Sequence, residues 1–348
     1  MTENGHRQPE GQSLSGRIGW DGALDAVRAE LNDCLLGAEE PVADVARHLA
    51  AQTGKGLRAS LLLAAASGSD GQVAADAVPA AAALELLHLA TLVHDDVIDD
   101  APMRRGQPSV QGRFGRKAAV LGGDYLFCRC FSLVANILSG YPDRFADFST
   151  GMTRVCLGEI EQLRQNRNLD LGLRGYLRII SGKTAALFAL ASYAGAILAG
   201  EPEPSARQHG RFGFLFGMLF QVMDDCLDYE DDESDARKTV RHDLAEGVVT
   251  PPLIYALARE PRLRKLASTV FSDPADLREV LGDVVAAGGL RDSWSLAERY
   301  HRKAQKQLDR IPDGIRRERM RAFLSEAVGS RTARMAAAAQ SKLQSAAV

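Results

Sequence analysis

The chain has 348 residues, of which 46% are hydrophobic and 25% are charged, and its 42 basic and 45 acidic side chains give a formal net charge of −3. This composition is ordinary for a globular protein and excludes wholesale disorder, a collagen-like repeat and a disulfide-stapled miniprotein. The absence of excess positive charge argues against binding to a nucleic-acid backbone. The 5 cysteines are dispersed and lack zinc-site spacing, which indicates reduced thiols and a cytoplasmic location.

Hydrophobic periodicity predicts an all-α protein. Residues 1–19 are polar, lack the apolar core of a signal peptide and are predicted to be a disordered lead-in, whereas residues 20–348 are predicted to form a single domain. Apolar residues at three- and four-residue spacing predict these helices, in chain order: Leu24–Leu36, Val78–Ile98, Ala118–Leu138, Phe148–Leu163, Tyr176–Leu198, Phe212–Tyr229 and Trp294–Leu308. Turn residues predict breaks at Ser67–Gly71, Ser139–Pro142 and Gly200–Pro204.

Two further stretches need separate interpretation. Thr184–Gly200 contains no charged residue. It is shorter than the roughly 20 residues that span a bilayer, so a buried core helix is predicted and no membrane span is expected. The charged stretch Glu230–Arg241 is predicted to be a surface loop.

Two aspartate clusters carry the candidate chemistry. Both place aspartates at offsets 0, 1 and 4 near the end of an apolar helical run; their members are Asp95, Asp96, Asp99, Asp224, Asp225 and Asp228. Offsets of zero and four lie above one another on a helix, and like charges there repel by roughly 0.2–0.5 kcal/mol per pair. Because burial adds to this cost, cations must compensate, and oxygen ligands suit Mg²⁺. One such cluster is often only a solvated helix end, but two with the same spacing predict a metal-bound polyanion between them.

Basic residues near these clusters agree with an anionic ligand. They are Lys55, Arg58, Arg104, Arg105, Lys183 and Lys238. Lys55 and Arg58 stand just before an apolar helix, whose N-terminus favours anions. Each residue alone is typical of a surface cation, but together with two metal clusters they predict a second anionic site beside the metal-bound one.

The motifs resemble those of the trans-type isoprenyl diphosphate synthases, also called polyprenyl synthetases. The matching segments are His88–Asp100 with the following Met103–Ser109, then Gly182–Phe188 and Phe220–Tyr229. Together they are specific, whereas a single Asp-Asp-x-x-Asp motif is weak. The resemblance covers roughly Gly54–Leu257 closely. It implies an all-α fold of the isoprenoid synthase type, a large helical bundle around a central cavity, with Mg²⁺ dependence and a homodimer.

The resemblance also implies a role for each matching residue. The six aspartates bind Mg²⁺ around an allylic diphosphate, which is neutralised by Arg104, Lys183 and Lys238. A second substrate, isopentenyl diphosphate, is held by Lys55, Arg58, His88 and Arg105, and the reacting region is lined by Thr184 and Gln221. Fixed cations and Mg²⁺ stabilise the diphosphate charge that grows as the allylic C–O bond breaks. The isopentenyl double bond then attacks the carbocation, so no protein nucleophile is required.

The sequence departs from the family pattern at three positions. Thr53 replaces the first glycine of Gly-Gly-Lys, Ala59 replaces a frequent proline, and Val248 replaces a lysine in a later loop. Loss of that lysine removes one possible diphosphate contact.

Small residues before the first cluster bear on product length. Thr91 and Ala90 precede Asp95 by four and five positions, about 6 and 7.5 Å along a helix at roughly 1.5 Å per residue. In the family, bulky aromatics at these positions stop elongation early. The sequence therefore predicts a medium- or long-chain product, longer than geranylgeranyl diphosphate, with Leu126 and Phe127 as candidates for the tunnel end. Close helix packing is the alternative reason for Ala90.

Other functions stay open. A short-chain farnesyl or geranylgeranyl diphosphate synthase shares every motif except the chain-length positions. A class I terpene cyclase also combines an α-bundle with Mg²⁺, but its second metal motif normally mixes Asn, Ser and Glu. A non-catalytic subunit of a heteromeric synthase would lack catalytic residues, and both clusters are complete here.

Overall fold

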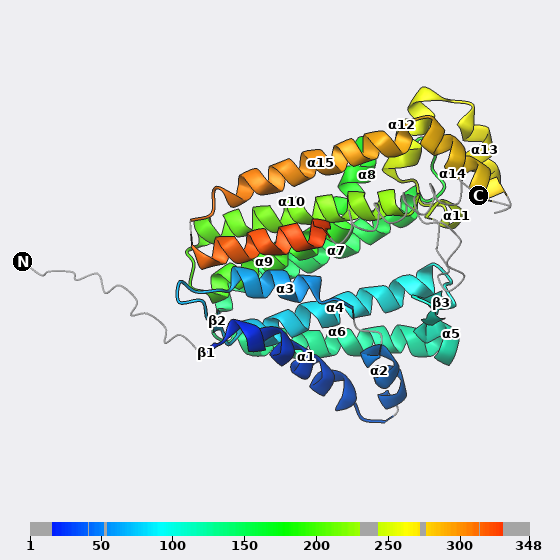
Figure 1. The fold of residues 1–348 in the computed structure, drawn as a ribbon. Helices are drawn as coiled ribbons and strands as arrows, with labels where there is room; N and C mark the ends of the chain where they lie inside the picture. The colour runs from blue at the N-terminus through cyan, green and yellow to red at the C-terminus, as the bar shows by residue number, and fades with distance from the viewer. Residues whose placement is uncertain are drawn as a thin grey trace, which may run out of the picture.

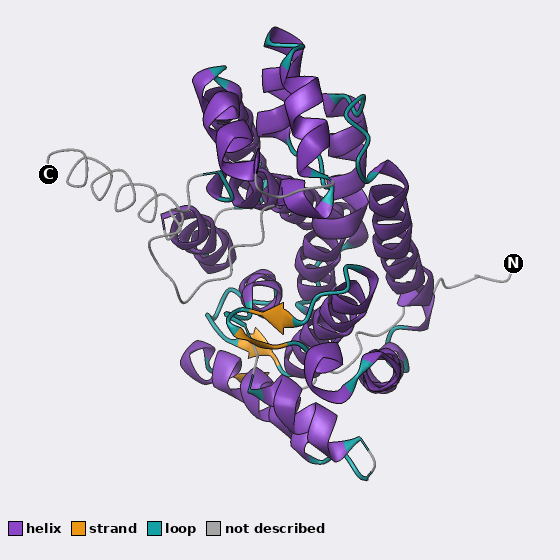
Figure 2. Ribbon diagram, turned by 90° about the vertical axis from the view of Figure 1, so that its right-hand side faces the viewer, coloured by secondary structure: helices purple, strands orange, loops and turns teal. Residues whose placement is uncertain are grey.

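The structure, a computed structural model, describes residues 16–40, 42–51, 54–229, 243–271, 276–312 and 314–329. These residues form an all-α bundle with two very short antiparallel strand pairs (Figures 1 and 2). The expected all-α fold is confirmed. Most of the predicted lead-in, the predicted loop Glu230–Arg241, Thr53 and Lys238 lie outside the described residues.

The elements follow one another in this order: β1 (Arg17–Ile18), α1 (Trp20–Leu36), α2 (Ala43–Ala50), α3 (Leu57–Ala65), β2 (Val73–Ala74), α4 (Ala77–Ile98), β3 (Met103–Arg104), β4 (Gln107–Pro108), α5 (Val110–Phe114), α6 (Arg116–Leu138), η1 (Pro142–Arg144), α7 (Phe145–Gln165), α8 (Leu173–Ile180), η2 (Ser181–Ala185), α9 (Ala186–Leu198), α10 (Glu203–Leu227), α11 (Asp243–Glu246), α12 (Pro251–Arg259), α13 (Leu263–Val270), α14 (Leu277–Ala286) and α15 (Gly289–Leu308). Residues 315–329 are also helical.

All seven predicted helices are present. The helix predicted at Tyr176–Leu198 is not continuous, because a π-helical turn, η2, divides it into α8 and α9. The strands were not predicted: β1 pairs antiparallel with β2 and β3 with β4, each over two residues. The end of the predicted lead-in is therefore ordered, since Arg17 pairs with Ala74.

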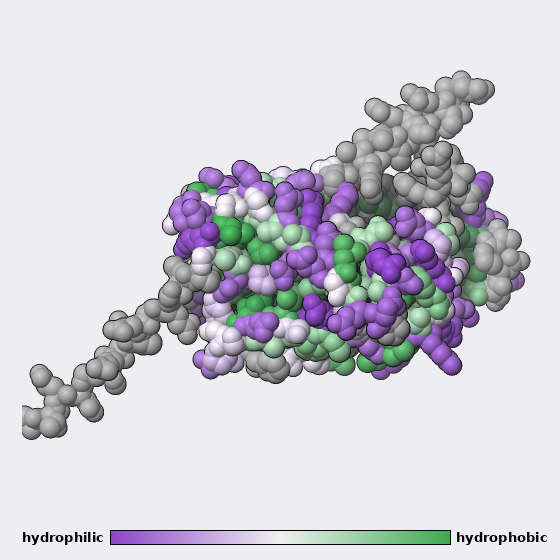
Figure 3. All heavy atoms as spheres, turned by 90° about the horizontal axis from the view of Figure 1, so that it is seen from below, coloured by the Kyte–Doolittle hydropathy of each residue, from purple (hydrophilic) through white to green (hydrophobic). Residues whose placement is uncertain are grey.

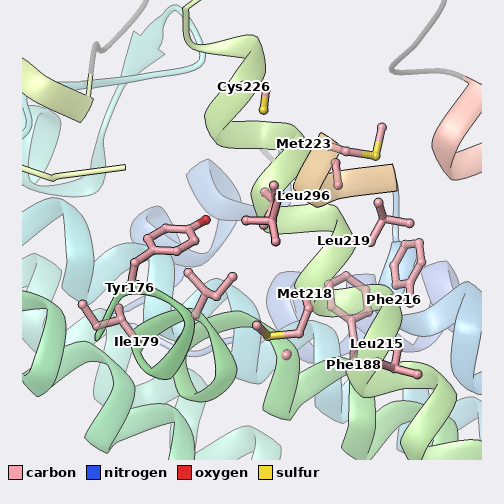
Figure 4. Close-up of a cluster of buried hydrophobic side chains, with 14 of the residues drawn as sticks. Tyr176, Ile179, Phe188, Leu215, Phe216, Met218, Leu219, Met223, Cys226 and Leu296 are labelled. Carbon is pink, nitrogen blue, oxygen red and sulfur yellow. The ribbon is translucent and has the colours of Figure 1, made fainter. Parts of the chain in front are cut away.

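The bundle has two apolar cores. One lies between α8, α9, α10, α12 and α15, where Phe188, Phe216 and Leu219 are almost fully buried (Figure 4). The other lies between α1, α3, α4 and α6 and includes Leu86 and Leu126. On the face shown in Figure 3, hydrophobic residues form separate patches among hydrophilic ones, as folded protein surfaces commonly do.

The two long helices α4 and α10 bring the predicted aspartate clusters to one end of the bundle. Both run in the same direction in Figure 1, so their carboxyl ends lie at the end where β3 and α11 are found. α4 is 22 residues long. At roughly 1.5 Å per residue it spans about 33 Å, so its start lies at the opposite end of the bundle.

Three helical segments are long and apolar enough to cross a membrane by length and composition: Ala77–Ile98, Arg116–Leu138 and Leu173–Leu198. Most of the first and third segments is buried inside the bundle. The predicted core helix within Thr184–Gly200 is thus confirmed as α9, with Phe188 and Ala191 fully buried. Of the apolar window in Arg116–Leu138, 28% is buried.

Close helix packing depends on glycine at the contact of α9 and α10. A Cβ atom on Gly213 would stand 2.2 Å from the backbone oxygen of Phe188. We expect Gly213→Ala to lower the free energy of unfolding by about 1–3 kcal/mol, because the helices must move apart. Gly282, in α14, is the matched control, since a Cβ there meets nothing within 4 Å. Gly282→Ala should leave stability unchanged or raise it by about 0.5–1 kcal/mol. Thermal and urea unfolding measure both, and equal stability of the two variants would contradict the packing argument.

Candidate active site

The first aspartate cluster divides into two side chains that solvent reaches and one that is buried and bonded to the protein. Asp95 is half-buried and its carboxylate lies 3.8 Å from the Lys183 ammonium. Asp99 is exposed. Asp96, in contrast, is only 2% exposed and accepts a 2.8 Å hydrogen bond from Arg104 Nε. Asp95 and Asp99 are therefore accessible to a ligand, and Asp96 is occupied by Arg104.

The second cluster repeats this division on α10. Asp224 is exposed and Asp228 is half-buried. Asp225 is 3% exposed and accepts hydrogen bonds from Tyr176 Oη and from Gln221 Nε2. Burial raises the pKa of Asp225 to about 7 despite these two donors. In both clusters, the second aspartate is thus buried and bonded to the protein.

A hydrogen-bonded chain links the second cluster to the π-helical turn. Thr184 Oγ1 donates to Gln221 Oε1 at 2.7 Å, and Gln221 Nε2 donates to Asp225 Oδ1 at 2.7 Å. Tyr176 on α8 completes the chain from the other side. The structure therefore joins Thr184 to Gln221, two residues that the sequence assigned to one reacting region, and fixes the amide orientation of Gln221.

Lys183 is held between α4 and α7. Its ammonium lies 2.8 Å from Glu159 and 3.8 Å from Asp95. A π-helical turn contains an extra backbone residue and is frequent at functional sites. It carries Lys183 here, and α7 approaches it so closely that a Cβ on Gly158 would stand 2.2 Å from Lys183 N. The turn and Gly158 together place a cation against Asp95.

Glu159 was not identified from the sequence. Burial raises the pKa of Glu159 to about 7, against the pull of Lys183 and with added repulsion from Asp95. Burial likewise raises the pKa of Asp95, where Lys183 opposes the shift and Asp99 adds to it. Asp95, Asp99 and Glu159 thus all act electrostatically on Lys183, which concentrates acidic groups at this end of the bundle.

Asp243 is a second acidic residue that sequence reasoning missed. Its backbone N donates to Asp228 Oδ2 at 2.9 Å. Burial, together with the nearby Asp228 and Asp225, raises the pKa of Asp243 well above its usual value. The only sequence signal was an aspartate some distance after the second cluster, which no spacing rule connects to it.

The predicted isopentenyl site lies on the other side of α4. A cleft of about 800 Å³ is lined by residues that include Lys55, His88 and Arg105. Burial lowers the pKa of Arg58 to about 10, and burial with the positive charges of Arg58 and Arg105 lowers the pKa of His88 well below its usual value. Such crowded cations are stabilised by a bound anion.

Two contacts fix the first turn of α3, which carries Arg58. Glu85, which was not identified from the sequence, is 7% exposed and accepts a 3.0 Å hydrogen bond from Ala59 N at the start of α3. The Arg58 guanidinium lies 4.8 Å from the centre of the Phe188 ring. Ala59, which replaces the family's frequent proline, thus supplies a backbone donor that proline lacks.

The predicted chain-length residues occupy different environments. Ala90 is completely buried in the apolar core, whereas Thr91 is half-exposed and its hydroxyl donates to His88 O at 2.8 Å. Thr91 lies one helical turn before Asp95, on the same side of α4. Of the two tunnel-end candidates, Leu126 is fully buried and the Phe127 ring lies 5.5 Å from that of His94.

The carboxylates fit Mg²⁺ that arrives with a diphosphate. Among the described residues, no three His, Cys, Asp or Glu side chains converge into a preformed metal cage. Mg²⁺ commonly takes only one or two carboxylates and completes its octahedron with waters and substrate phosphates. The raised pKa of the Asp95 carboxyl marks a place where added positive charge is favourable.

Glu159 allows a test of this charge balance by pH. Its folded pKa of about 7 lies above the ordinary value of 4.5, so the folded state binds the proton more tightly than the unfolded state. The resulting stabilisation is present below pH 4.5 and is lost as the pH rises through 7. Between pH 4.5 and 7, we expect the free energy of unfolding to fall less in Glu159→Gln than in wild type. Urea unfolding in the absence of metal measures this difference.

Glu161→Gln is the control on the same helix. Hydrogen bonding from Arg164 lowers the pKa of Glu161. The contribution of Glu161 to folding stability therefore changes only at more acidic pH. Superimposable pH profiles of wild type and Glu159→Gln would show that Glu159 is not buried as the structure places it.

Comparisons with known proteins agree with this geometry. A family model described as polyprenyl synthetase matches residues 39–284. The chain is 38% identical over 292 residues to heptaprenyl diphosphate synthase component 2 of Geobacillus stearothermophilus, covering 83% of this chain and 90% of that protein. The crystal structure of a decaprenyl diphosphate synthase from Rhodobacter capsulatus superposes with a TM-score of 0.80 at 31% identity, covering 89% and 96% of the two chains.

A further solved structure bears on the ligands. The polyprenyl synthase of Caulobacter crescentus CB15, crystallised with calcium and isoprenyl diphosphate, superposes with a TM-score of 0.79 at 31% identity, covering 88% of this chain and 94% of that one. A divalent metal and a prenyl diphosphate are therefore found together in a protein of this fold.

Proposed function

Since the chain belongs to the polyprenyl synthetase family, we propose that it condenses isopentenyl diphosphate with an allylic diphosphate in a Mg²⁺-dependent reaction that releases diphosphate. It is a trans-type prenyl diphosphate synthase of the medium- to long-chain class, as the names of its heptaprenyl and decaprenyl relatives indicate. The observation that carries the proposal is that α4 and α10 end at the same end of the bundle, where the Asp95 carboxylate lies 3.8 Å from the Lys183 ammonium.

The proposed metal ligands are the accessible members of each cluster. Asp95 and Asp99 would hold Mg²⁺ on one side of the allylic diphosphate, and Asp224 and Asp228 on the other. Bound Mg²⁺ would supply a Lewis acid for the leaving diphosphate. The resemblance implied that all six aspartates bind Mg²⁺. We propose four of them as ligands, because Asp96 and Asp225 are buried and bonded to the protein.

The remaining residues would bind and orient the substrates. Lys183, held by Glu159, would neutralise the allylic diphosphate. The same role for Lys238 stays a prediction from the sequence. Arg104 is engaged by Asp96 and would act by holding that carboxylate. Lys55, Arg58, His88 and Arg105 would bind isopentenyl diphosphate, whose charge relieves their mutual repulsion. Thr184 and Gln221 would line the reacting region.

Product analysis tests the function directly. Purified protein is incubated with Mg²⁺, farnesyl diphosphate and excess isopentenyl diphosphate, and products are identified by chromatography and mass spectrometry. We expect linear diphosphates longer than geranylgeranyl. Arrest at geranylgeranyl length would identify a short-chain synthase, and a cyclic hydrocarbon would identify a terpene cyclase. Absence of turnover by the chain alone would favour a heteromeric enzyme, as the name of the component 2 relative suggests for that protein.

The accessible aspartates should matter most in the transition state. We expect Asp95→Ala and Asp224→Ala to lower kcat by about a hundredfold or more, with smaller changes in KM, because they remove fixed stabilisation of the leaving diphosphate. Asp25→Ala is the control, since Asp25 forms only an exposed ion pair with Arg28. Steady-state kinetics measures all three variants, and wild-type turnover by either cluster variant would disprove the two-cluster mechanism.

We further propose a cytoplasmic homodimer without a membrane span. Six of the nine exposed large hydrophobic residues of the described structure lie on α6 and α7: Val120, Leu121, Phe131, Leu157, Ile160 and Leu163. The less buried apolar segment of α6 is then covered by a partner subunit and not by lipid. Exposed apolar surface of this kind marks association sites, and two-fold dimers are the commonest oligomers.

Charge placed on this face should separate the subunits. We expect Leu121→Arg and Leu157→Arg to shift the mass in sedimentation equilibrium from dimer to monomer, because an unpaired guanidinium would be buried in the interface. Leu36→Arg is the control, since Leu36 is similarly exposed at 58% but lies at the end of α1. A wild-type monomer, or dimers of unchanged affinity in both variants, would contradict the proposed interface.

A further inference from the structure

A buried carboxylate lies in the basic cleft beside α4. Glu85 lines this cleft together with Lys55, His88 and Arg105, and it is only 7% exposed. Among the described residues that line the cleft, Glu85 is the only acidic one. A negative charge beside a bound diphosphate opposes its binding. Attraction of the ligand therefore gives no reason for a carboxylate at this position, and its contacts within the protein must be considered.

The Glu85 carboxylate caps the start of another helix. Its Oε1 accepts a 3.0 Å hydrogen bond from the backbone N–H of Ala59, 26 residues earlier in the chain. Ala59 is the third residue of α3, and the N–H groups of a first helical turn have no partner within their own helix. The residue before α3 is Gly56, which has no side chain to accept such a bond. The cap of α3 thus comes from α4.

The capped turn carries Arg58. The Arg58 guanidinium lies 4.8 Å from the centre of the Phe188 ring on α9. Among the described residues, the buried Nε of Arg58 has no hydrogen-bond partner. Burial lowers the pKa of Arg58 to about 10, and the charge of Glu85 opposes this shift. Because Nε is not bonded, the place of this cation depends on the place of the first turn of α3.

One face of α4 connects the cap to the rest of the cleft. Glu85, His88, Leu89 and Leu92 all line the cleft, and their offsets of 0, 3, 4 and 7 place them on one side of a helix. His88 lies one turn after Glu85 on this face. The bond between Glu85 and Ala59 therefore fixes the start of α3 relative to His88.

This bond depends on a residue at which the chain departs from the family pattern. The family frequently has proline where this chain has Ala59, and proline has no backbone N–H. A carboxylate on α4 could not cap α3 through a proline at this position. Ala59 and Glu85 therefore form a pair, in which the backbone of one residue gives the side chain of the other its function.

We propose that Glu85 is a positioning residue of the isopentenyl diphosphate site, which caps α3 through Ala59 N–H and so places Arg58 for the diphosphate. This inference rests on the proposed function. Glu85 acts on the ligand through the start of α3 and not by contact with it. The cap also takes one N–H group of this helix start, so the diphosphate is bound by the surrounding side chains.

Steady-state kinetics tests the proposal. Glu85→Ala removes the acceptor and should raise the KM for isopentenyl diphosphate about tenfold, as expected for loss of a hydrogen bond to a charged group. The KM for farnesyl diphosphate and the kcat should stay within about twofold of wild type, because the aspartate end is not altered. Glu85→Gln keeps an oxygen that can accept from Ala59 N–H, so it should restore the KM to within about threefold of wild type.

Two further measurements do not depend on turnover. Calorimetric titration with isopentenyl diphosphate in the absence of Mg²⁺ should show weaker binding in Glu85→Ala than in wild type and Glu85→Gln. Hydrogen exchange of the amides in the first turn of α3 should be faster in Glu85→Ala alone. Val280→Ala is the control for lost stability, because Val280 is fully buried on α14, away from the cleft. It should lower the Tm without changing the KM or this exchange.

A double mutant tests the pairing with Ala59. Ala59→Pro removes the donor, so adding Glu85→Ala to it should not raise the KM for isopentenyl diphosphate further, since partners in one bond are not additive. Fully additive effects would contradict the cap. Should Ala59→Pro not fold, the two Glu85 variants decide the result.

The outcomes separate this inference from the proposed function. A fall in the KM for isopentenyl diphosphate in Glu85→Ala and Glu85→Gln would show that the carboxylate only repels the diphosphate, which overturns the positioning role. An unchanged KM in Glu85→Ala, or an equal rise in Val280→Ala, would overturn it too. If wild type binds isopentenyl diphosphate but does not condense it, the proposed function fails, and calorimetry and hydrogen exchange still test the cap.

Discussion

Repulsion between carboxylates at one end of the bundle is the constraint on which the rest of the site depends. α4 and α10 each deliver three aspartates there, and Glu159 and Asp243 add two more. Exposed like charges cost only a few tenths of a kcal/mol per pair, but partial burial makes each charge more costly. The raised pKa values of Asp95, Glu159, Asp225 and Asp243 are consequences of this crowding and burial. Binding of cations stabilises this end of the bundle.

Within the described part of the chain, several side chains compensate part of this charge. Arg104 engages Asp96, and the Tyr176–Gln221 pair satisfies Asp225, so the second aspartate of each cluster is fixed within the fold. Fixing these two side chains orients the ends of α4 and α10, from which the neighbouring carboxylates project. Lys183 supplies one further positive charge between α4 and α7. On the proposed function, metal ions that arrive with the diphosphate would add further positive charge, so substrate binding and charge compensation would be the same event.

Sequence patterns predicted what depends on local spacing. The long helices and the two clusters follow from helical periodicity, and the choice of Thr184 and Gln221 as site residues follows from motif resemblance. Glu159 could not be found in this way, because on α7 it looks like any charged helix residue and only the close approach permitted by Gly158 places it against Lys183. The burial of Asp96 and Asp225 was equally invisible, since offset alone does not say which carboxylate faces the protein. The two-residue strands carry no periodicity at all.

On the proposed function, the diphosphate end of the product is held and the other end of the hydrocarbon is not. Each condensation would join the allylic carbon to isopentenyl diphosphate at the aspartate end, so the opposite end of the hydrocarbon would move away from the carboxylates with every cycle. Thr91 lies one helical turn before Asp95 on the same side of α4 and is half-exposed, whereas Ala90 is completely buried in the apolar core. Of these two small side chains, Thr91 is therefore the one that would bear on a growing chain, and Ala90 contributes to close helix packing.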